Sequence, residues 1–419
     1  MRLTRRVSVA VAAVAALLAA ATACSSDGGG TTAPKDVEVF TWWADGGEKA
    51  GLDGLVGQFG SDCANFTFVN GAVAGGAGAN AKQVLASRLA QGDPPDTFQA
   101  HAGAELNDYI AAGQLEDLSA QYQEWGLTNA FPKGLIDNLT VDGKIYSVPA
   151  NIHRANVLWG NKAVLASAGI TADATSLDGF FADLEKLKAK GVTPLALGRD
   201  WTQLMLFESV LISDLGAAKF TGLWNGGTKW DGADVTQAIT DYQKLLTYTN
   251  TDRDTFDWTD AEKLLMDGKG GYQLMGDWEA ADLDAKKFTG YSYSVFPGNG
   301  STFQWLADSF VLPKGAPNPE GTKCWLKTVG SQAGQQAFNT KKGSIPARTD
   351  ASASAFPAYQ QAAIADWKSQ AQVPSCAHGS ACSQGFQGAL NSAMGKFSSD
   401  GNATALQTAL VAAATQFAK

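Results

Sequence analysis

The chain has 419 residues, of which 45% are hydrophobic and 17% charged, so it is globular rather than disordered. That length predicts about two domains, or one large fold divided into two lobes. The formal net charge of −9 argues against nucleic acid as a partner and against a basic membrane-binding face.

The N-terminal segment predicts export. An apolar run, residues 7–21, follows three basic residues and ends at Ala-Thr-Ala-Cys, which is typical of a secretory signal peptide over residues 1–23. The run is shorter than the roughly 20 residues of a membrane span. Cysteine directly after small residues matches the lipobox of bacterial lipoproteins, so we expect Cys24 to be acylated, although Ala21 stands where leucine is usual. Residues 24–35 then form a flexible tether, and the protein is expected on the outer face of the cytoplasmic membrane.

Removal of the leader leaves 29 basic and 41 acidic residues, a net charge of −12, and four further cysteines. An even number of cysteines in an oxidising compartment indicates disulfides, and four allow three pairings. Cys376 and Cys382 are close enough to close a small loop, which would leave Cys63 with Cys324. A zinc site is the rival interpretation, but neither a CxxC pair nor clustered histidines accompany these residues.

Strands and helices alternate from residue 36 onward, which predicts a largely parallel sheet. Residues rich in β-branched and aromatic side chains predict strands at 36–42, 66–69, 96–100, 144–148, 271–275 and 291–296. Helical spacing of apolar residues predicts a helix from Glu48, another through Val84 and Leu89, and others over 177–190, 235–248 and 258–266. The C-terminal third is also expected to be helical.

Three strand ends carry side chains suited to one kind of ligand. Trp42 and Trp43 end the first strand, Gln99 and His101 another, and Trp278 a third. Ligands in open α/β sheets bind beyond the carboxyl ends of the strands. Indoles offer flat surfaces to C–H groups, and charged or amide side chains bond hydroxyls. A polyhydroxylated ligand such as a pyranose sugar is therefore the class that these residues predict.

Seven segments carry a resemblance to a known family: WWADGGE, GDPPDTFQAH, VPANIHRANVLW, MGDWEAADL, FQWLADSFVLPK, KKGSIPARTD and CAHGSACSQGF. In this order they resemble the glucose/galactose-binding proteins of bacterial ABC sugar importers. Those proteins belong to the extracellular solute-binding proteins that include maltose-binding protein. The resemblance spans nearly the whole mature chain.

The resemblance implies a two-lobe α/β fold of the type II periplasmic-binding kind, with a hinge and an interlobe cleft. The expected lobes are 36–149 with 305–344, and 150–304 with 345–419. The crossings are expected near 148–151, 303–308 and Ile345. An ABC permease would be the protein partner, no cofactor is implied, and the chain is expected to be a monomer without enzymatic activity.

Carried over by motif, the sugar-binding residues are Trp42, Trp43, Glu48, Gln99, His101, Trp258, Trp278, Asp308, Lys342 and His378. The implied ligand is a monosaccharide, D-glucose first, with galactose or mannose as alternatives. Cys376 and Cys382 bracket His378 and depart from the family pattern; a bridge between them would stiffen the loop that carries this histidine.

Several assignments stay open at this stage. Neighbouring residues on a strand point to opposite faces, so either Trp42 or Trp43 could be plain core. Glu48 could serve only the helix N-terminus. His153 is expected to be structural, and Lys82 is a modest candidate for ligand contact.

Other functions remain as alternatives. Paired carboxylates with tryptophans also describe a glycoside hydrolase, although GxSxG and HExxH are absent from the sequence. A cello- or disaccharide-binding protein and a surface adhesin are further possibilities. Residues 72–81 lack the GK[ST] of a phosphate loop, and residues 251–262 fail the calcium-loop spacing, so no metal site is predicted.

Overall fold

The computed structural model describes residues 35–75 and 78–417. Its first strand places Val37 and Val39 in an apolar core and belongs to a five-stranded sheet. The described residues from 35 onward belong to one compact unit. The expected signal peptide (1–23), the acylated Cys24 and nearly all of the tether (24–35) lie outside the described residues. In the described part, every helix is too short or too polar to cross a bilayer.

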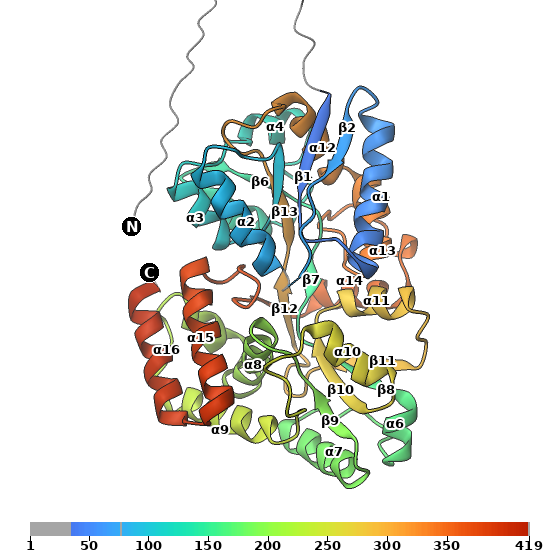
Figure 1. Ribbon diagram of the computed structural model, residues 1–419, viewed down its shortest axis with the longest axis vertical. Helices are drawn as coiled ribbons and strands as arrows, with labels where there is room; N and C mark the ends of the chain where they lie inside the picture. The colour runs from blue at the N-terminus through green and yellow to red at the C-terminus, as the bar shows by residue number, and fades with distance from the viewer. Residues whose placement is uncertain (1–34, 76–77, 418–419) are drawn as a thin grey trace, which may run out of the picture. The chain divides into compact units, whose positions relative to one another are not determined.

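The first sheet has the strand order β2-β1-β3-β13-β6 and lies in the upper half of Figure 1. Its strands are β1 (Asp36–Phe40), β2 (Thr67–Asn70), β3 (Thr97–His101), β6 (Ser147–Pro149) and β13 (Asp308–Val311). The elements packed around it are α1 (Gly46–Asp62), α2 (Ala79–Ala90), α3 (Glu105–Ala111), α4 (Ser119–Glu124), α5 (Lys133–Leu139), β4 (Thr140–Val141), β5 (Lys144–Ile145), α12 (Pro319–Gly330) and α13 (Gln332–Lys342). We call this part of the molecule the first lobe.

The second sheet has the order β11-β8-β10-β9 and lies in the lower half of Figure 1. Its strands are β8 (Val157–Asn161), β9 (Thr193–Ala196), β10 (Gly270–Met275) and β11 (Tyr291–Val295). Its helices are α6 (Lys162–Ser167), α7 (Leu177–Ala189), α8 (Trp201–Trp224), α9 (Ala233–Leu246), α10 (Trp258–Met266), α11 (Trp278–Ala285), α15 (Gln384–Asp400) and α16 (Ala403–Phe417). This part is the second lobe.

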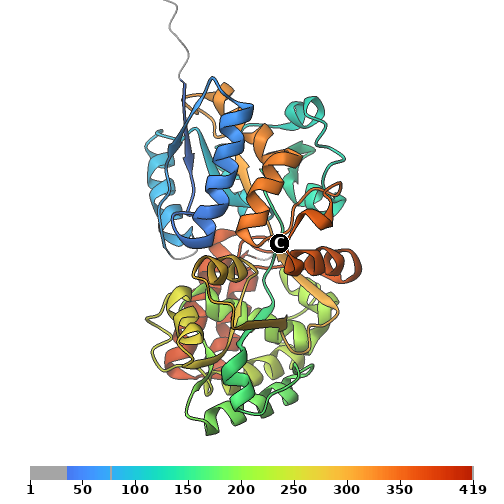
Figure 2. The ribbon, with the colours of Figure 1, turned by 90° about the vertical axis from the view of Figure 1, so that its right-hand side faces the viewer.

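A small sheet of order β14-β12-β7 joins the lobes, and Figure 2 shows the chain passing between them. Its strands are β7 (His153–Arg154), β12 (Thr302–Leu306) and β14 (Ala371–Pro374), which follows α14 (Ala358–Ser369) and the short 3-10 turn Ala353–Ala355. The chain crosses between β6 and β7 and returns between β12 and β13. Ile152 and Ile345 form an isolated antiparallel bridge beside these crossings.

The expectation of a largely parallel sheet holds for all but one strand of each sheet. β1 is parallel to β2 and β3, but β13 runs antiparallel to both β3 and β6. In the second sheet β8 is antiparallel to β10 and β11. The antiparallel strands β13 and β8 both lie directly next to a crossing, where the chain enters a sheet from the opposite lobe.

The residues of the two apolar cores agree only in part with the lobe boundaries expected from the sequence. One core gathers the buried residues of the second lobe with those of α15 and α16. The other is built around β1, β3, β13 and α12, and it also holds Ile345, Ala347, Phe356, Ala363 and Ile364. Residues 345–364 were expected in the second lobe, but their apolar side chains pack against the first because Ile345 pairs with Ile152 and α14 follows α13.

The described part of the chain holds two disulfides, in which Cys324 is partly buried and the other three cysteines are buried. Cys63, at the C-terminal end of α1, is joined to Cys324 of α12, 261 residues further along the chain. Cys376 is joined to Cys382 across a separation of six residues.

We expect the long-range disulfide to contribute more to stability than the short one. In the chain-entropy account, a bridge that closes a longer loop removes more freedom from the unfolded chain. The double variant Cys63→Ala/Cys324→Ala should lower the free energy of unfolding by about 2–5 kcal/mol in urea titrations. Repeating the titration with both proteins reduced is the control and should abolish the difference. Equal stability of the oxidised proteins would contradict this expectation.

Candidate functional site

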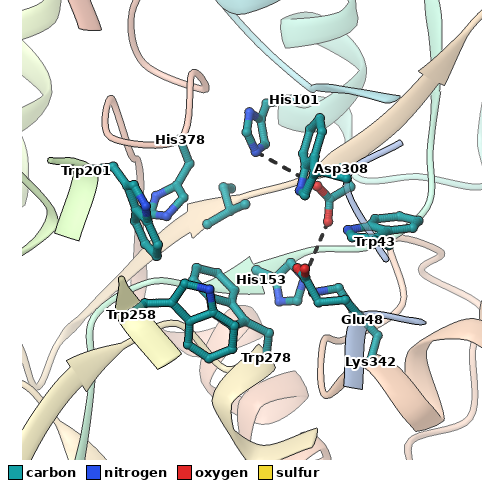
Figure 3. Close-up of a pocket in the computed structure, with 12 residues that line it drawn as sticks. Trp43, Glu48, His101, His153, Trp201, Trp258, Trp278, Asp308, Lys342 and His378 are labelled. Carbon is teal, nitrogen blue, oxygen red and sulfur yellow. Dashed lines mark hydrogen bonds and ion pairs between the residues drawn. The ribbon is translucent and has the colours of Figure 1, made fainter. Parts of the chain in front are cut away.

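A pocket lies where both lobes and the joining strands meet, and Figure 3 shows its side chains arranged around the carboxylate of Asp308. About 370 Å³ within it is free of protein atoms, counting the space at its mouth. The first lobe contributes mainly polar groups and the second mainly rings. The pocket is lined by Trp42, Trp43, Glu48, His101, His153, Trp201, Trp258, Trp278, Leu306, Asp308, Lys342 and His378.

Asp308 is the first residue of β13 and is only 3% exposed. Its Oδ1 accepts a hydrogen bond from Gln99 Nε2 at 2.9 Å, and its Oδ2 accepts one from Asn151 Nδ2 at 2.8 Å. The backbone N–H of Asp308 donates in turn to Asn151 Oδ1 at 2.8 Å. The carboxylate is therefore held by neutral amide donors that come from β3 and from the first crossing.

Two histidines lie beside this carboxylate. His101 pairs with Asp308 in the β3–β13 register, and its Nε2 lies 3.9 Å from Oδ1. His153 Nε2 lies 3.4 Å from Oδ2, while its Nδ1 bonds Asp277. Burial alone would raise the pKa of Asp308, but His153, His101 and Lys342 together hold it well below its usual range. Asp308 is thus a charged acceptor at neutral pH.

His153 is held between two carboxylates. Burial lowers its pKa, but Asp277 and Asp308 together outweigh burial and leave the pKa raised. Asp277 is anchored by the backbone N–H of Arg154, which donates to its Oδ2 at 3.0 Å. The expectation of a structural role for His153 is incomplete, because the residue also lines the pocket.

His101 is oriented from behind by Glu105 of α3. Its Nδ1 lies 2.8 Å from Glu105 Oε2, which also bonds Lys82 Nζ at 2.7 Å. Burial opposes the charge on Glu105, but Lys82 and His101 lower its pKa to about 2. Lys82, a modest ligand candidate from the sequence, belongs instead to this supporting ion pair and lies 5.7 Å from the ring of Trp42.

Trp42 and Trp43 both line the pocket, although alternation along a strand allowed only one of them to do so. β1 ends at Phe40, so the two indoles lie in a bend where strand alternation no longer applies. Trp42 packs 5.1 Å from the ring of His101. Trp43 packs 4.7 Å from the ring of Phe338, and its Nε1 finds no hydrogen-bond partner within the described ranges.

Glu48 and Lys342 form an ion pair at the edge of the pocket. Lys342 Nζ lies 3.1 Å from Glu48 Oε1 and between the rings of Trp43 and Trp278, at 5.8 and 5.6 Å from their centroids. The pKa of Glu48 is raised because burial outweighs the attraction of Lys342. Glu48 also lies in the first turn of α1, so the helix-terminus role and the pocket role hold together.

Three helices of the second lobe each begin with a tryptophan that faces the pocket. Trp201 begins α8, Trp258 begins α10 and Trp278 begins α11, and each follows an aspartate in the sequence. Trp278 lies 6.1 Å from Trp201 between ring centroids. Trp201 was not predicted from the sequence, and the threefold Asp-Trp pattern is the signal that could have identified it.

His378 lies in the loop closed by the Cys376–Cys382 disulfide and is 3% exposed. Its ring packs 5.4 Å from Trp278, and its Nδ1 lies 2.9 Å from Ser375 Oγ. The pKa of His378 falls well below its usual value because of burial and the positive charges of His101 and His153. His378 is therefore neutral at physiological pH.

Backbone contacts between the lobes close the pocket on two sides. On one side Gly47 N–H donates to Asp282 Oδ1 at 3.1 Å. On the other, the N–H groups of Ala104 and Glu105 donate to Ser380 O and Gly379 O at 3.2 and 2.9 Å. A Cβ on Gly46, where φ is +56°, would lie 2.1 Å from the same Asp282 oxygen. The Gly-Gly pair after WWAD is thus required by close approach of the lobes.

Nine of the ten residues expected to bind ligand line this one pocket. Gln99 does not: it lies behind Asp308, and its Oε1 accepts hydrogen bonds from Thr41 Oγ1 and from the backbone N–H of Trp42. The pocket also includes three residues beyond the expected set, His153, Trp201 and Leu306. Within the described ranges no group of three His, Cys, Asp or Glu side chains is arranged to hold a metal ion.

Comparison with known proteins identifies the family. A family model described as bacterial extracellular solute-binding protein matches residues 43–336. The chain belongs to the bacterial extracellular solute-binding protein family. The two-lobe α/β fold of this solute-binding protein also matches a solved structure of the bacterial solute receptor AcbH, with a TM-score of 0.80 and 21% identity, over 91% of this chain and 98% of that one.

Two relatives extend the comparison. An uncharacterized ABC transporter extracellular-binding protein of Pyrococcus horikoshii is 35% identical over 86% of this chain and 83% of its own. The xylose/arabinose-binding protein XacG of Haloferax volcanii is 31% identical over 91% of this chain and 84% of its own. Because these alignments extend over most of both chains, they include both lobes of this solute-binding protein.

The buried carboxyl groups predict that the protein gains stability as pH falls from about 8 to about 5. Burial raises the pKa of Glu208 from 4.5 to about 7, and it raises those of Glu262 and Glu279 as well. In this window the folded chain binds more protons than the unfolded chain, so lowering the pH favours folding. For Glu208 alone the difference corresponds to roughly 3 kcal/mol.

Below pH 6.5 the neutral His378 makes the folded protein less stable as the pH falls. It is one group against the three glutamates whose pKa values are raised. Below about pH 4 the trend should reverse, because the lowered pKa values of Glu105 and Asp308 make their protonation destabilising. Urea unfolding across this pH range measures the profile. A stability maximum at or above pH 8 would contradict the raised pKa values of the buried glutamates.

Proposed function

We propose that this solute-binding protein captures a monosaccharide between its lobes and delivers it to an ABC permease. The observation that carries the proposal is Asp308, a charged acceptor at the centre of a pocket walled by five tryptophans. A buried carboxylate that keeps its charge and faces a cavity is suited to hydroxyl donors. The indoles supply flat apolar surface for the C–H faces of a sugar ring.

The polar groups around the pocket suit the rim of a pyranose. Asp308 and Glu48 accept hydrogen bonds, Lys342 donates, and the histidines can complete the set. A hydrogen bond to a charged group contributes about 1.5–3 kcal/mol net. Micromolar affinity corresponds to about 8 kcal/mol, which several such contacts supply after ordering costs.

The printed ligands of two similar proteins support a monosaccharide. XacG is named a xylose/arabinose-binding protein, and AcbH is described as having an exclusive substrate preference for β-D-galactopyranose. The motif resemblance places D-glucose first, with galactose or mannose as alternatives. We further propose that the protein acts as a monomer without a cofactor, held at the outer face of the cytoplasmic membrane by lipid on Cys24.

One observation also fits a glycoside hydrolase. The pKa of Glu48 is raised while that of Asp308 is lowered, and hydrolases separate an acid from a base in this way. Against this, Glu48 is paired with Lys342, and the relative with a stated ligand is named a binding protein. We therefore favour binding, and 4-nitrophenol release from aryl glucosides by the pure protein is the discriminating assay.

Removal of the charge on Asp308 should abolish high-affinity binding. In wild-type protein, D-glucose should change the tryptophan fluorescence reversibly, with saturation in the micromolar range. Asp308→Asn should weaken binding by at least 100-fold, because two charged hydrogen bonds of about 1.5–3 kcal/mol each are lost. Asp183→Asn, which removes a buried carboxylate paired with Lys186 in α7, is the matched control and should bind normally.

A wild-type protein that responds to none of glucose, galactose, mannose, xylose and arabinose would overturn the proposal. Normal binding by Asp308→Asn would show that the sugar lies elsewhere.

The size of the pocket predicts selectivity against longer sugars. The pocket is small, because its free space of about 370 Å³ includes the space at its mouth, and interlobe backbone contacts close two of its sides. We expect cellobiose and maltose to bind at least 100-fold more weakly than the preferred monosaccharide in calorimetric titrations. Tighter binding of either disaccharide would favour the disaccharide-binding alternative.

A further inference from the structure

A buried chain of hydrogen bonds leads from helix α8 to the wall of the pocket. Glu208, in the middle of α8, is completely buried. Its Oε2 accepts from Ser375 Oγ and from Gln304 Nε2, both at 2.7 Å. Its Oε1 accepts from the backbone N–H groups of Cys376 and Ala377, at 2.6 and 3.2 Å. The carboxylate is thus surrounded by four donors and holds the start of the disulfide loop.

The direction of each hydrogen bond in this chain can be worked out. Backbone N–H groups can only donate, so Oε1 of Glu208 must act as an acceptor. Ser375 has a single hydroxyl hydrogen, and when Glu208 is ionised the contact with Oε2 uses it. Toward His378, therefore, Ser375 Oγ can only accept, and His378 Nδ1 at 2.9 Å must carry a hydrogen.

A neutral histidine has one N–H, so this assignment also fixes the other nitrogen. With the hydrogen on Nδ1, His378 Nε2 presents a lone pair. This atom is buried and has no hydrogen-bond partner in the ranges that the structure describes, and the ring faces the pocket beside Trp201 and Trp278.

We propose that Glu208, acting through Ser375, is a positioning residue that fixes the tautomer of His378 and so makes Nε2 a hydrogen-bond acceptor for a ligand hydroxyl. This role rests on the proposed function, because it concerns the ligand of the same pocket. Next to Nε2 the pocket therefore favours a ligand group that donates a hydrogen bond. A hydroxyl satisfies Nε2, whereas fluorine or an ether oxygen at the same position leaves it unpaired.

A single isosteric substitution should reverse the direction of the hydrogen bonds from residue 208 to His378. In Glu208→Gln the two backbone N–H groups still require an oxygen, so the side-chain NH₂ takes the place of Oε2. It then donates to Ser375, whose hydroxyl turns to donate to His378 Nδ1, and the histidine proton moves to Nε2. Gln304 can turn its amide to accept, since its Oε1 is unbonded in the described part of the chain.

Nitrogen-15 NMR of histidine-labelled protein tests the tautomer directly, and the chain has only three histidines to assign. Spectra are recorded without sugar at about pH 8.5, where Glu208 is ionised. His378 in the wild-type protein should show a protonated Nδ1 and an unprotonated Nε2. In Glu208→Gln the two nitrogens should exchange their shifts. Glu279→Gln removes a buried carboxyl group from the same lobe and should leave the spectrum of His378 unchanged.

A proton on Nε2 in the wild type would overturn the proposal whether or not the variant folds, and so would an unchanged tautomer in folded Glu208→Gln. Affinity for D-glucose and its monodeoxyfluoro analogues gives the second readout. In the wild-type protein, one fluoro analogue should bind more weakly than glucose because it leaves Nε2 unpaired. In Glu208→Gln, the ratio of the two affinities should be at least tenfold smaller. Unchanged ratios for every analogue would contradict a role in selecting the ligand. If the wild type binds no sugar, the proposed function fails, and the tautomer is judged from the spectra alone.

Discussion

The structure of the pocket depends on keeping one buried carboxylate charged. An isolated charge out of water is very costly, so Asp308 exists as an anion only because its surroundings satisfy it. Gln99 and Asn151 donate to its oxygens, and His101 and His153 lie beside it. These partners come from β3, the first crossing and β7, so the carboxylate is assembled only when the joining strands are in register. The joining strands and the centre of the pocket are in this sense one structure.

The lobes supply different chemistry to that centre. Charged and amide groups come from the first lobe, where the strand ends of β1, β3 and β13 meet, and the rings of Trp201, Trp258 and Trp278 come from helix starts in the second. Neither set encloses a ligand alone. Contact between Gly47 and Asp282 on one side, and between α3 and the disulfide loop on the other, brings the two sets together. The site is therefore complete in this structure because the two lobes are in contact.

Much of this site could be predicted from the sequence, because the family motifs carry Asp308, Lys342 and His378 to positions that line one pocket. The sequence was less informative where a residue acts through others: Gln99 lies behind Asp308, and Glu208 is a single acid within α8. That helix is buried on nearly all sides of its first half, so its apolar residues show no helical alternation, and it was missed together with Trp201. The reversed direction of β13 and of β8 was not predicted, since each of these strands lies next to a crossing.

The central claim is that a monosaccharide binds at Asp308 between the lobes. A crystal structure of the mature protein grown with D-glucose tests it most directly. The account predicts one sugar ring in the pocket, with its hydroxyls bonded to the carboxylate of Asp308 and its faces against indole rings from both lobes. A ring bound elsewhere on the protein would contradict it, and so would a pocket left without sugar at saturating concentration.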